Sequence, residues 1–330
     1  MSSTALPSLS AAAPRIEYLP LDPGQALPEN VLFAVQFGCG KASAPARCAR
    51  VGLEPLAGAG LTEVWYANGA VHTGFDGQIR FACDDHHLAA AIEVDERQHG
   101  GLAGAAAYVY SHIAEFQLRS KYHHLQRIWN YLDDINSGAG DEERYRVFCS
   151  GRSEGLKSLG LERFPAATAI GRRDGSYRLQ VYWLAGREPG FALENPRQMS
   201  AYQYPRQYGP TPPAFSRAML VAPDLLMISG TASIVGHASQ HAGSVKRQMT
   251  EIFKNLDSVL TRARAHTPEL PGKFGRSTLI KAYLRDAADL EMVESALRER
   301  LPPETPFLVL LGDVCRADLL VEFDCLHAAE

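Results

Sequence analysis

Glu322 is the residue of this chain whose neighbours in the sequence most favour acid–base chemistry. Leu319, Leu320 and Val321 precede it and Phe323 follows it, an apolar run that predicts a strand. On a strand this glutamate could simply face solvent. It could also lie in a poorly hydrated cleft, where burial would raise the pKa of the carboxyl and keep it protonated as a general acid. The residues alone leave both interpretations open.

A thiol and a set of arginines and tyrosines are the other candidates for chemistry. Cys315 stands seven residues before Glu322 and is either a small buried hydrophobe or a functional group. Arginine binds a carboxylate through two parallel hydrogen bonds, and a tyrosine hydroxyl can donate a hydrogen bond to a carboxylate or a hydroxyl. Each of these residues alone could equally be a surface or packing residue. The candidates are Arg152, Arg217, Tyr131, Tyr145 and Tyr202, with Arg127 and Arg144 in reserve.

Several classes of function find no support in the sequence. It holds no phosphate-binding glycine loop, dinucleotide fingerprint or zinc-protease helix, so we expect no cofactor and no metal. His237 and His241 are four residues apart, but Gly236 and Gly243 interrupt the segment, and we expect His237 to make a structural hydrogen bond. The basic residues are scattered and the net charge is −4, which predicts no nucleic-acid partner.

The sequence also predicts a cytoplasmic location. No apolar run approaches the about 18 residues that a membrane span needs, and residues 1–14 lack the features of a signal peptide. The six cysteines form no C-x-x-C pair and fit no zinc module, so we expect free thiols in a reducing compartment.

A proline-rich segment divides the chain. Residues 188–214 contain six prolines together with Tyr202, Tyr204 and Tyr208, so this segment should form neither a regular helix nor a central strand. Because a plain linker would be less aromatic, we expect an ordered connection that lines a cleft. The predicted organisation is a flexible tail over 1–14, an N-terminal α+β domain over 15–187, this connection, and a C-terminal domain over 215–330.

The expected elements differ in clarity between the two blocks. In the first, the patterns predict strands at 31–37, 61–66, 78–83 and 177–184, helices at 102–118 and 122–132, a strand or short helix at 144–149, and a loop over 156–168. In the second, they predict a hairpin of 218–220 with 225–229, a helix over 245–265 capped by Ser244, a strand at 277–284, a helix at 290–301, and strands at 307–314 and 319–326. Two long helices on one face of a single sheet make an α+β architecture.

The second block resembles the RidA/YjgF superfamily along nearly its full length. The segments that carry the resemblance are 226–233 (LMISGTAS), 248–260 (QMTEIFKNLDSVL), 279–286 (LIKAYLRD), 290–301 and 307–323. That family forms trimers with ligand clefts between adjacent subunits. Its deaminases carry a carboxylate-binding arginine where this chain has Val309, which argues against imine deamination.

The whole chain resembles a narrower family, the chorismatases, which pair a RidA-like C-terminal domain with a related N-terminal half. The resemblance implies two α+β domains, each a mixed sheet with helices on one face. Five motifs carry it: 127–136 (RIWNYLDDIN), 144–152 (RYRVFCSGR), 194–209 (ENPRQMSAYQYPRQYG), 229–237 (SGTASIVGH) and 312–322 (GDVCRADLLVE). It implies removal of the enolpyruvyl group of chorismate as pyruvate, by a monomer or a homotrimer.

The resemblance also implies roles for particular residues. Glu322 matches the catalytic acid, and Cys315 matches a cysteine of the members that form 3-hydroxybenzoate, where the thiol would orient groups or relay a proton. Ala232 matches a position where we expect glycine in strict 3-hydroxybenzoate formers and alanine in members that hydrolyse chorismate to a dihydroxycyclohexadiene carboxylate. This mixed signature best fits a third type, which makes both 3- and 4-hydroxybenzoate. Arg152, Arg217 and Tyr202 are the favoured substrate anchors.

Overall fold

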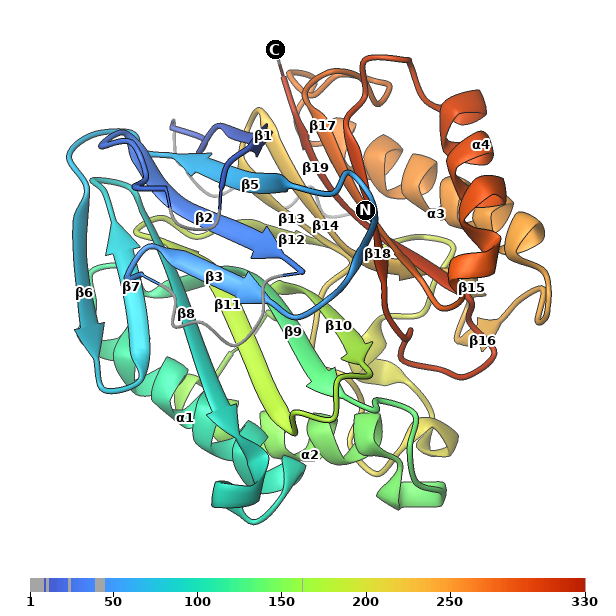
Figure 1. The fold of residues 1–330 in the computed structure, drawn as a ribbon, viewed down its shortest axis with the longest axis horizontal. Coiled ribbons are helices and arrows are strands. Elements are labelled where there is room, and N and C mark those ends of the chain that lie inside the picture. Colours follow the sequence, from blue (N-terminus) through green and yellow to red (C-terminus); the bar gives the residue numbers. More distant parts are fainter. Residues whose placement is uncertain (1–8, 10–11, 23–24, 39–44, 162, 330) are drawn as a thin grey trace.

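The computed structural model describes residues 9, 12–22, 25–38, 45–161 and 163–329, and three sheets dominate it (Figure 1). The first has six strands in the order β10-β9-β11-β8-β7-β6. Its strands are β6 (His72–Asp76), β7 (Ile79–Cys83), β8 (His87–Asp95), β9 (His124–Asp133), β10 (Ala166–Arg172) and β11 (Arg178–Gly186). Helices α1 (Leu102–Arg119) and α2 (Arg144–Leu156) cover one face of this sheet.

The second sheet has seven strands in the order β12-β13-β14-β19-β17-β18-β4. Its strands are β4 (Pro55–Ala57), β12 (Phe191–Leu193), β13 (Ala218–Ala222), β14 (Leu225–Ala232), β17 (Thr278–Leu284), β18 (Phe307–Leu311) and β19 (Val321–Ala328). Helices α3 (Val245–Arg264) and α4 (Leu290–Arg300) pack on one face. A short ladder, β15 (Ile234–Val235) with β16 (Ala238–Ser239), follows β14.

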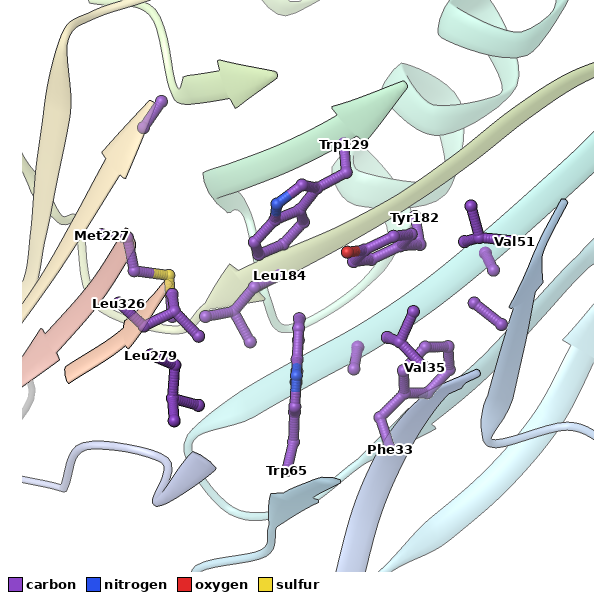
Figure 2. Packing of buried hydrophobic residues seen from close by; sticks show 14 of the residues in the cluster. Phe33, Val35, Val51, Trp65, Trp129, Tyr182, Leu184, Met227, Leu279 and Leu326 are labelled. Atoms are coloured by element: carbon purple, nitrogen blue, oxygen red, sulfur yellow. The ribbon is translucent and has the colours of Figure 1, made fainter. Parts of the chain in front are cut away.

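The third sheet was not expected as a separate layer. It has four strands in the order β1-β5-β2-β3, formed by β1 (Ile16–Pro20), β2 (Val31–Phe37), β3 (Cys48–Val51) and β5 (Leu61–Tyr66). One hydrophobic cluster draws side chains from all three sheets. In Figure 2, Trp65 of this third sheet points toward Trp129 and Tyr182 of the first. The rings of Trp129 and Tyr182 stack with centroids 4.6 Å apart.

The C-terminal elements confirm the sequence patterns closely. The hairpin, both helices and the three later strands form where expected, and the Ser244 side chain accepts a hydrogen bond from the Arg247 amide as the N-cap of α3. Together with the helices on one face of each mixed sheet, this confirms the predicted α+β fold class. The domain boundaries stay a prediction, to which the structure adds that β12 of the connection and β4 of the N-terminal block both pair with C-terminal strands.

The N-terminal block contains the main error of the sequence analysis. Residues 122–132 were expected to form a helix, but they contain most of β9, which lies between β10 and β11. Nine of its ten residues are buried, including the polar Gln126, Arg127 and Asn130, so its sequence has no alternation of apolar and polar residues that would separate a strand from a helix. The end of the expected 156–168 loop belongs to β10, and the open choice at 144–149 resolves as α2.

Helix α2 packs unusually close to α1 because it carries glycine at two contact positions. A Cβ atom at Gly151 would collide with the Ala103 carbonyl oxygen, and one at Gly155 with that of Ala107. Gly151 therefore serves helix packing, which places the next residue, Arg152, at the base of the site described below.

Most of the predicted tail over 1–14 lies outside the described residues. Cys39, one of the six cysteines expected to be free thiols, also lies outside them. Within the described part of the chain, no helix is both long enough and apolar enough to cross a membrane.

Candidate active site

A cavity lies where the first two sheets meet. Strand β10 runs beside β14, where the Ala167 amide donates to Ser229 Oγ over 2.9 Å, and Ala166 bridges to Ser216 just before β13. The cavity has a volume of about 790 Å³, part of which is open to solvent. Its lining comes from α2, β10, β14, β19, the connection and the loop before β19. The lining residues are Glu143, Tyr145, Arg146, Arg152, Ala167, Thr168, Ala169, Tyr204, Tyr208, Pro213, Phe215, Arg217, Gly230, Ala232, Ile234, Cys315, Arg316 and Glu322.

Glu322 lies on β19 and points into this cavity with only 5% of its surface exposed. Burial, followed by the nearby charge of Asp324, raises the pKa of its carboxyl from the usual 4.5 to about 8, against the smaller opposing influence of Arg127 and Arg217. The group therefore carries its proton at neutral pH, as a general acid must. The solvent-facing alternative left open by the sequence is wrong.

A β-bulge in β14, next to the residue that pairs with Glu322, shapes the surroundings of this carboxyl. Between Ile228 and Thr231 the β14 register against β19 shifts by one residue, so the Gly230 amide leaves the ladder and donates to Thr168 Oγ1 over 3.0 Å. A Cβ atom at Gly230 would collide with Glu322 Oε1. Only glycine therefore lets the backbone approach the carboxyl this closely. Ala232, the cross-strand partner of Glu322, lines the same cavity.

Cys315 is half-buried on the loop before β19 and packs against Ala232. Burial, followed by the charge of Glu322, raises the pKa of its thiol to about 12, so it is a neutral thiol at physiological pH rather than a thiolate. Tyr145 of α2 completes this side of the cavity, and burial raises the pKa of its hydroxyl well above the usual value. Both side chains can therefore serve as hydrogen-bond donors beside Glu322.

Arginines give the cavity its charge. Arg152 is 4% exposed, and its Nε and Nη2 atoms are buried without a hydrogen-bond partner among the described residues. Arg217 donates from Nη2 to the Met199 carbonyl oxygen over 2.7 Å and to the Tyr204 hydroxyl over 2.8 Å, which leaves its buried Nε unpaired. Unpaired buried guanidinium nitrogens are costly, so these two side chains are suited to hold an anion that enters the cavity.

Three further residues line the cavity and were not expected as site residues. Tyr204 and Tyr208 belong to the connection, and Arg316 belongs to the loop that carries Cys315. The Arg316 guanidinium lies 3.9 Å from the Tyr208 ring centroid and 5.2 Å from that of Tyr204. Arg316 Nη1 also donates to the His237 carbonyl oxygen over 2.9 Å, and the Tyr208 hydroxyl lies 3.1 Å from His237 Nδ1. This confirms the structural hydrogen bond expected of His237, and the connection does line the cavity.

Two of the tyrosines expected to bind substrate lie outside the lining of this cavity. Tyr131 is fully buried in the central core, with its hydroxyl 3.3 Å from that of Tyr283. Tyr202 is 38% exposed and packs on Phe164. Among the described residues, neither is part of the cavity lining. In the 200–209 segment, Tyr204 and Tyr208 line the cavity. Because the segment is irregular, the spacing of its tyrosines could not predict which of them would do so.

The two reserve arginines serve the structure. Arg144 Nη2 donates to both oxygens of Glu96, at 3.0 and 2.9 Å, and its Nε donates to the Asp133 carbonyl oxygen. Arg127 lies beneath the cavity and donates to Thr168 Oγ1 over 2.5 Å. Across the part of the chain that the structure describes, no three His, Cys, Asp or Glu side chains gather as metal ligands would.

Two of the three sheets that share the central core enclose an arginine-lined cavity around one protonated carboxyl, an arrangement typical of a site for a small molecule. Comparison with known proteins identifies the family. The family profile described as chorismatase FkbO/Hyg5-like, N-terminal, matches residues 63–185. A 3-hydroxybenzoate synthase of Streptomyces hygroscopicus is 36% identical over 80% of this chain and 80% of its own length. A chorismatase of Streptomyces rapamycinicus is 34% identical over 80% and 81%.

A solved chorismatase crystal structure superposes with a TM-score of 0.85 over 97% of this chain and 100% of that chain, at 32% identity. The chain belongs to the chorismatase family.

Proposed function

We propose that this protein converts chorismate to pyruvate and 3-hydroxybenzoate, with 4-hydroxybenzoate as a second aromatic product. The observation that carries the proposal is the buried carboxyl of Glu322, protonated at neutral pH and facing a cavity that also holds Cys315 and the unpaired nitrogens of Arg152. Chorismate carries two carboxylates, a hydroxyl and an enol ether, and each of these groups finds a complementary side chain in this cavity.

In the proposed reaction Glu322 delivers its proton to the enolpyruvyl group, which weakens the ether bond to the ring. The ring hydroxyl then displaces the leaving oxygen within the molecule and forms an epoxide. One C–O bond of the epoxide opens, and loss of a ring proton makes the ring aromatic. The atoms of chorismate equal those of 3-hydroxybenzoate plus pyruvate, so this route consumes no water and needs no redox partner. We propose that the neutral thiol of Cys315 orients the ring hydroxyl or relays its proton.

We propose Arg152 as the first carboxylate anchor and Arg217 as the second. Arg152 supports this role best, because two of its buried nitrogens await an acceptor, and a planar guanidinium matches a carboxylate with two parallel hydrogen bonds. We propose that Tyr145, and Tyr204 in place of Tyr202, donate to the remaining oxygens, since both line the cavity.

One observation favours a second candidate. Ala232 lines the cavity opposite Glu322, and the family resemblance associates alanine there with hydrolysis. In that reaction water would add to the protonated enol ether, and the products would be pyruvate and the trans-dihydroxycyclohexadiene carboxylate.

The test is incubation of the purified protein with chorismate in ¹⁸O-labelled water, followed by chromatography with authentic standards. We expect pyruvate with 3-hydroxybenzoate whose hydroxyl carries no label. A non-aromatic diol would establish hydrolysis instead. Glu322→Gln should abolish turnover, whereas Glu299→Gln, an exposed change on α4, should not. Binding without any turnover of the wild type would indicate a metabolite-binding protein.

A further inference from the structure

A cluster of four charged side chains lies in the central core, outside the cavity. Glu63, Arg127, Lys281 and Asp324, here called the buried charge cluster, are each at most 1% exposed. Lys281 Nζ lies 2.8 Å from Glu63 Oε2 and 3.6 Å from Asp324 Oδ1, and Arg127 Nη2 lies 3.5 Å from Asp324 Oδ2. The cluster joins strands β5, β9, β17 and β19, so it spans all three sheets.

Stability alone is a poor explanation for this cluster. Moving each charge out of water carries a penalty of several kcal/mol, and well-packed apolar residues often replace buried ion pairs without loss of stability. The surrounding core is dense and aromatic: the Lys281 ammonium lies 4.7 Å from the Trp129 ring centroid. An apolar core of this size would hold the sheets together without charges. A role of the cluster in the neighbouring cavity is therefore the better explanation.

Asp324 is the member nearest the chemistry. It follows Glu322 by two residues on β19, so both side chains leave the same face of the sheet with Cα atoms about 7 Å apart. Asp324 Oδ2 accepts hydrogen bonds from Tyr283 Oη at 2.7 Å, Thr168 Oγ1 at 3.1 Å and Trp129 Nε1 at 3.2 Å. These donors and the two flanking cations fix the carboxylate in place.

Thr168 connects the cluster to the cavity. Its hydroxyl donates to Asp324 and accepts from the amide of Gly230, the residue whose backbone touches the Glu322 carboxyl. One side chain thus separates the fixed carboxylate from the proposed acid. The titratable or charged groups facing Glu322 are Asp324 from its own strand, Arg127 from β9, Arg217 before β13, Tyr145 from α2 and Cys315 from the preceding loop.

We propose that Asp324 is a positioning residue for the proposed reaction: its carboxylate, fixed within the buried charge cluster, opposes a second negative charge on Glu322. This inference rests on the proposed function. It gives the cluster a use that apolar packing could not replace, because a fixed negative charge in a dry core acts on its neighbour with little screening. Asp324 is also the second-largest cause of the raised Glu322 pKa, after burial itself.

Two neutral double variants test it. Asp324→Asn/Lys281→Met and Glu63→Gln/Lys281→Met each remove one positive and one negative charge from the cluster, but only the first removes the charge beside Glu322. The readout is infrared spectroscopy of the protonated carboxyl band that Glu322→Gln abolishes, followed as the pH is raised. In the wild type the band should disappear near pH 8. In the Asp324 variant it should disappear roughly one to two pH units lower, as expected if the two charges are about as far apart as the Cα atoms, about 7 Å, at an effective dielectric constant of about 20.

The Glu63 variant should behave as the wild type does, and in each protein the alkaline fall of kcat/KM on chorismate should follow the band. A band lost at the same pH in all three proteins would overturn the inference, and so would an equal displacement in both variants. Asp324→Asn alone, which keeps the shape of the side chain, serves if the first variant does not fold. Absence of turnover by the wild type would refute the proposed function instead, and the infrared result would still decide whether Asp324 acts on Glu322.

Discussion

Replacing Glu322 by glutamine should stabilise the folded protein at alkaline pH, although it removes the proposed acid. Burial raises the pKa of this carboxyl from 4.5 to about 8 in the folded chain, whereas in the unfolded chain the group titrates near its usual value. Between these two pH values the folded state keeps a proton that the unfolded state has released. The free energy of unfolding of the wild type must therefore fall as the pH rises through this window.

The size of the effect follows from the same two values. A shift of the pKa from 4.5 in the unfolded chain to about 8 in the folded chain corresponds to about 5 kcal/mol of unfolding free energy, at about 1.4 kcal/mol for each pH unit. Glutamine has nearly the shape of the neutral carboxyl and does not titrate. The free energy of unfolding of Glu322→Gln minus that of the wild type should therefore grow by about 4 kcal/mol from about pH 5 to about pH 9.

Urea unfolding at a series of pH values measures this difference, and the buried residues Trp65, Trp129 and Trp183 provide the fluorescence signal. Glu299→Gln, on the exposed face of α4, is the matched control, for which the difference should stay nearly flat. A flat difference for Glu322→Gln as well would mean that this carboxyl titrates as an exposed one, and the argument for a protonated acid would fail.

Further predictions concern the cavity and the assembly. Gly230→Ala should lower kcat by at least about 100-fold with the fold retained, because its methyl group displaces Glu322; steady-state kinetics and circular dichroism measure both. Arg152→Lys should raise KM by about 10- to 100-fold, since an ammonium group cannot form the paired hydrogen bonds, and an unchanged KM would remove Arg152 as an anchor. Cys315→Ala should shift the products toward the non-aromatic diol, which chromatography detects; an unchanged ratio would leave Cys315 without a role. Of the two expected assemblies, monomer and homotrimer, light scattering should find the monomer, because one chain already closes three sheets around a central core.

The C-terminal half was predictable because its helices and strands each bury one face. The stripe of α3, its Ser244 cap and the hairpin before it follow from local spacing. The N-terminal half was less predictable because its central strands are buried on both faces. Strand β9 packs against helices on one side and the three-sheet core on the other, so its sequence lacks the alternation that marks a half-buried strand.

In the site too, residues within motifs could be predicted, and residues whose place depends on contacts between distant segments could not. Glu322, Cys315, Ala232 and Arg152 came from motifs and do line one cavity. Tyr131 was chosen for its residue type, and its burial in the core depends on the register of β9 between two neighbours. Thr168 lies in none of the motifs, and Arg316 lies in one without being distinguished from its neighbours, because the importance of both arises only when β10 meets β14 and the loop before β19 contacts the connection.

The buried charge cluster extends this dependence to a sheet that never reaches the cavity. Glu63 belongs to the third sheet, and the Trp65 indole donates to its Oε1 over 2.8 Å while Lys281 contacts its Oε2. Without this carboxylate Lys281 would face Asp324 with an uncompensated positive charge, and the balance of charges behind Glu322 would change. The third sheet therefore does more than close the core: it supplies the partner that keeps the cluster neutral. The strands of the third sheet are therefore part of the proposed acid's environment, although none of their described residues lines the cavity.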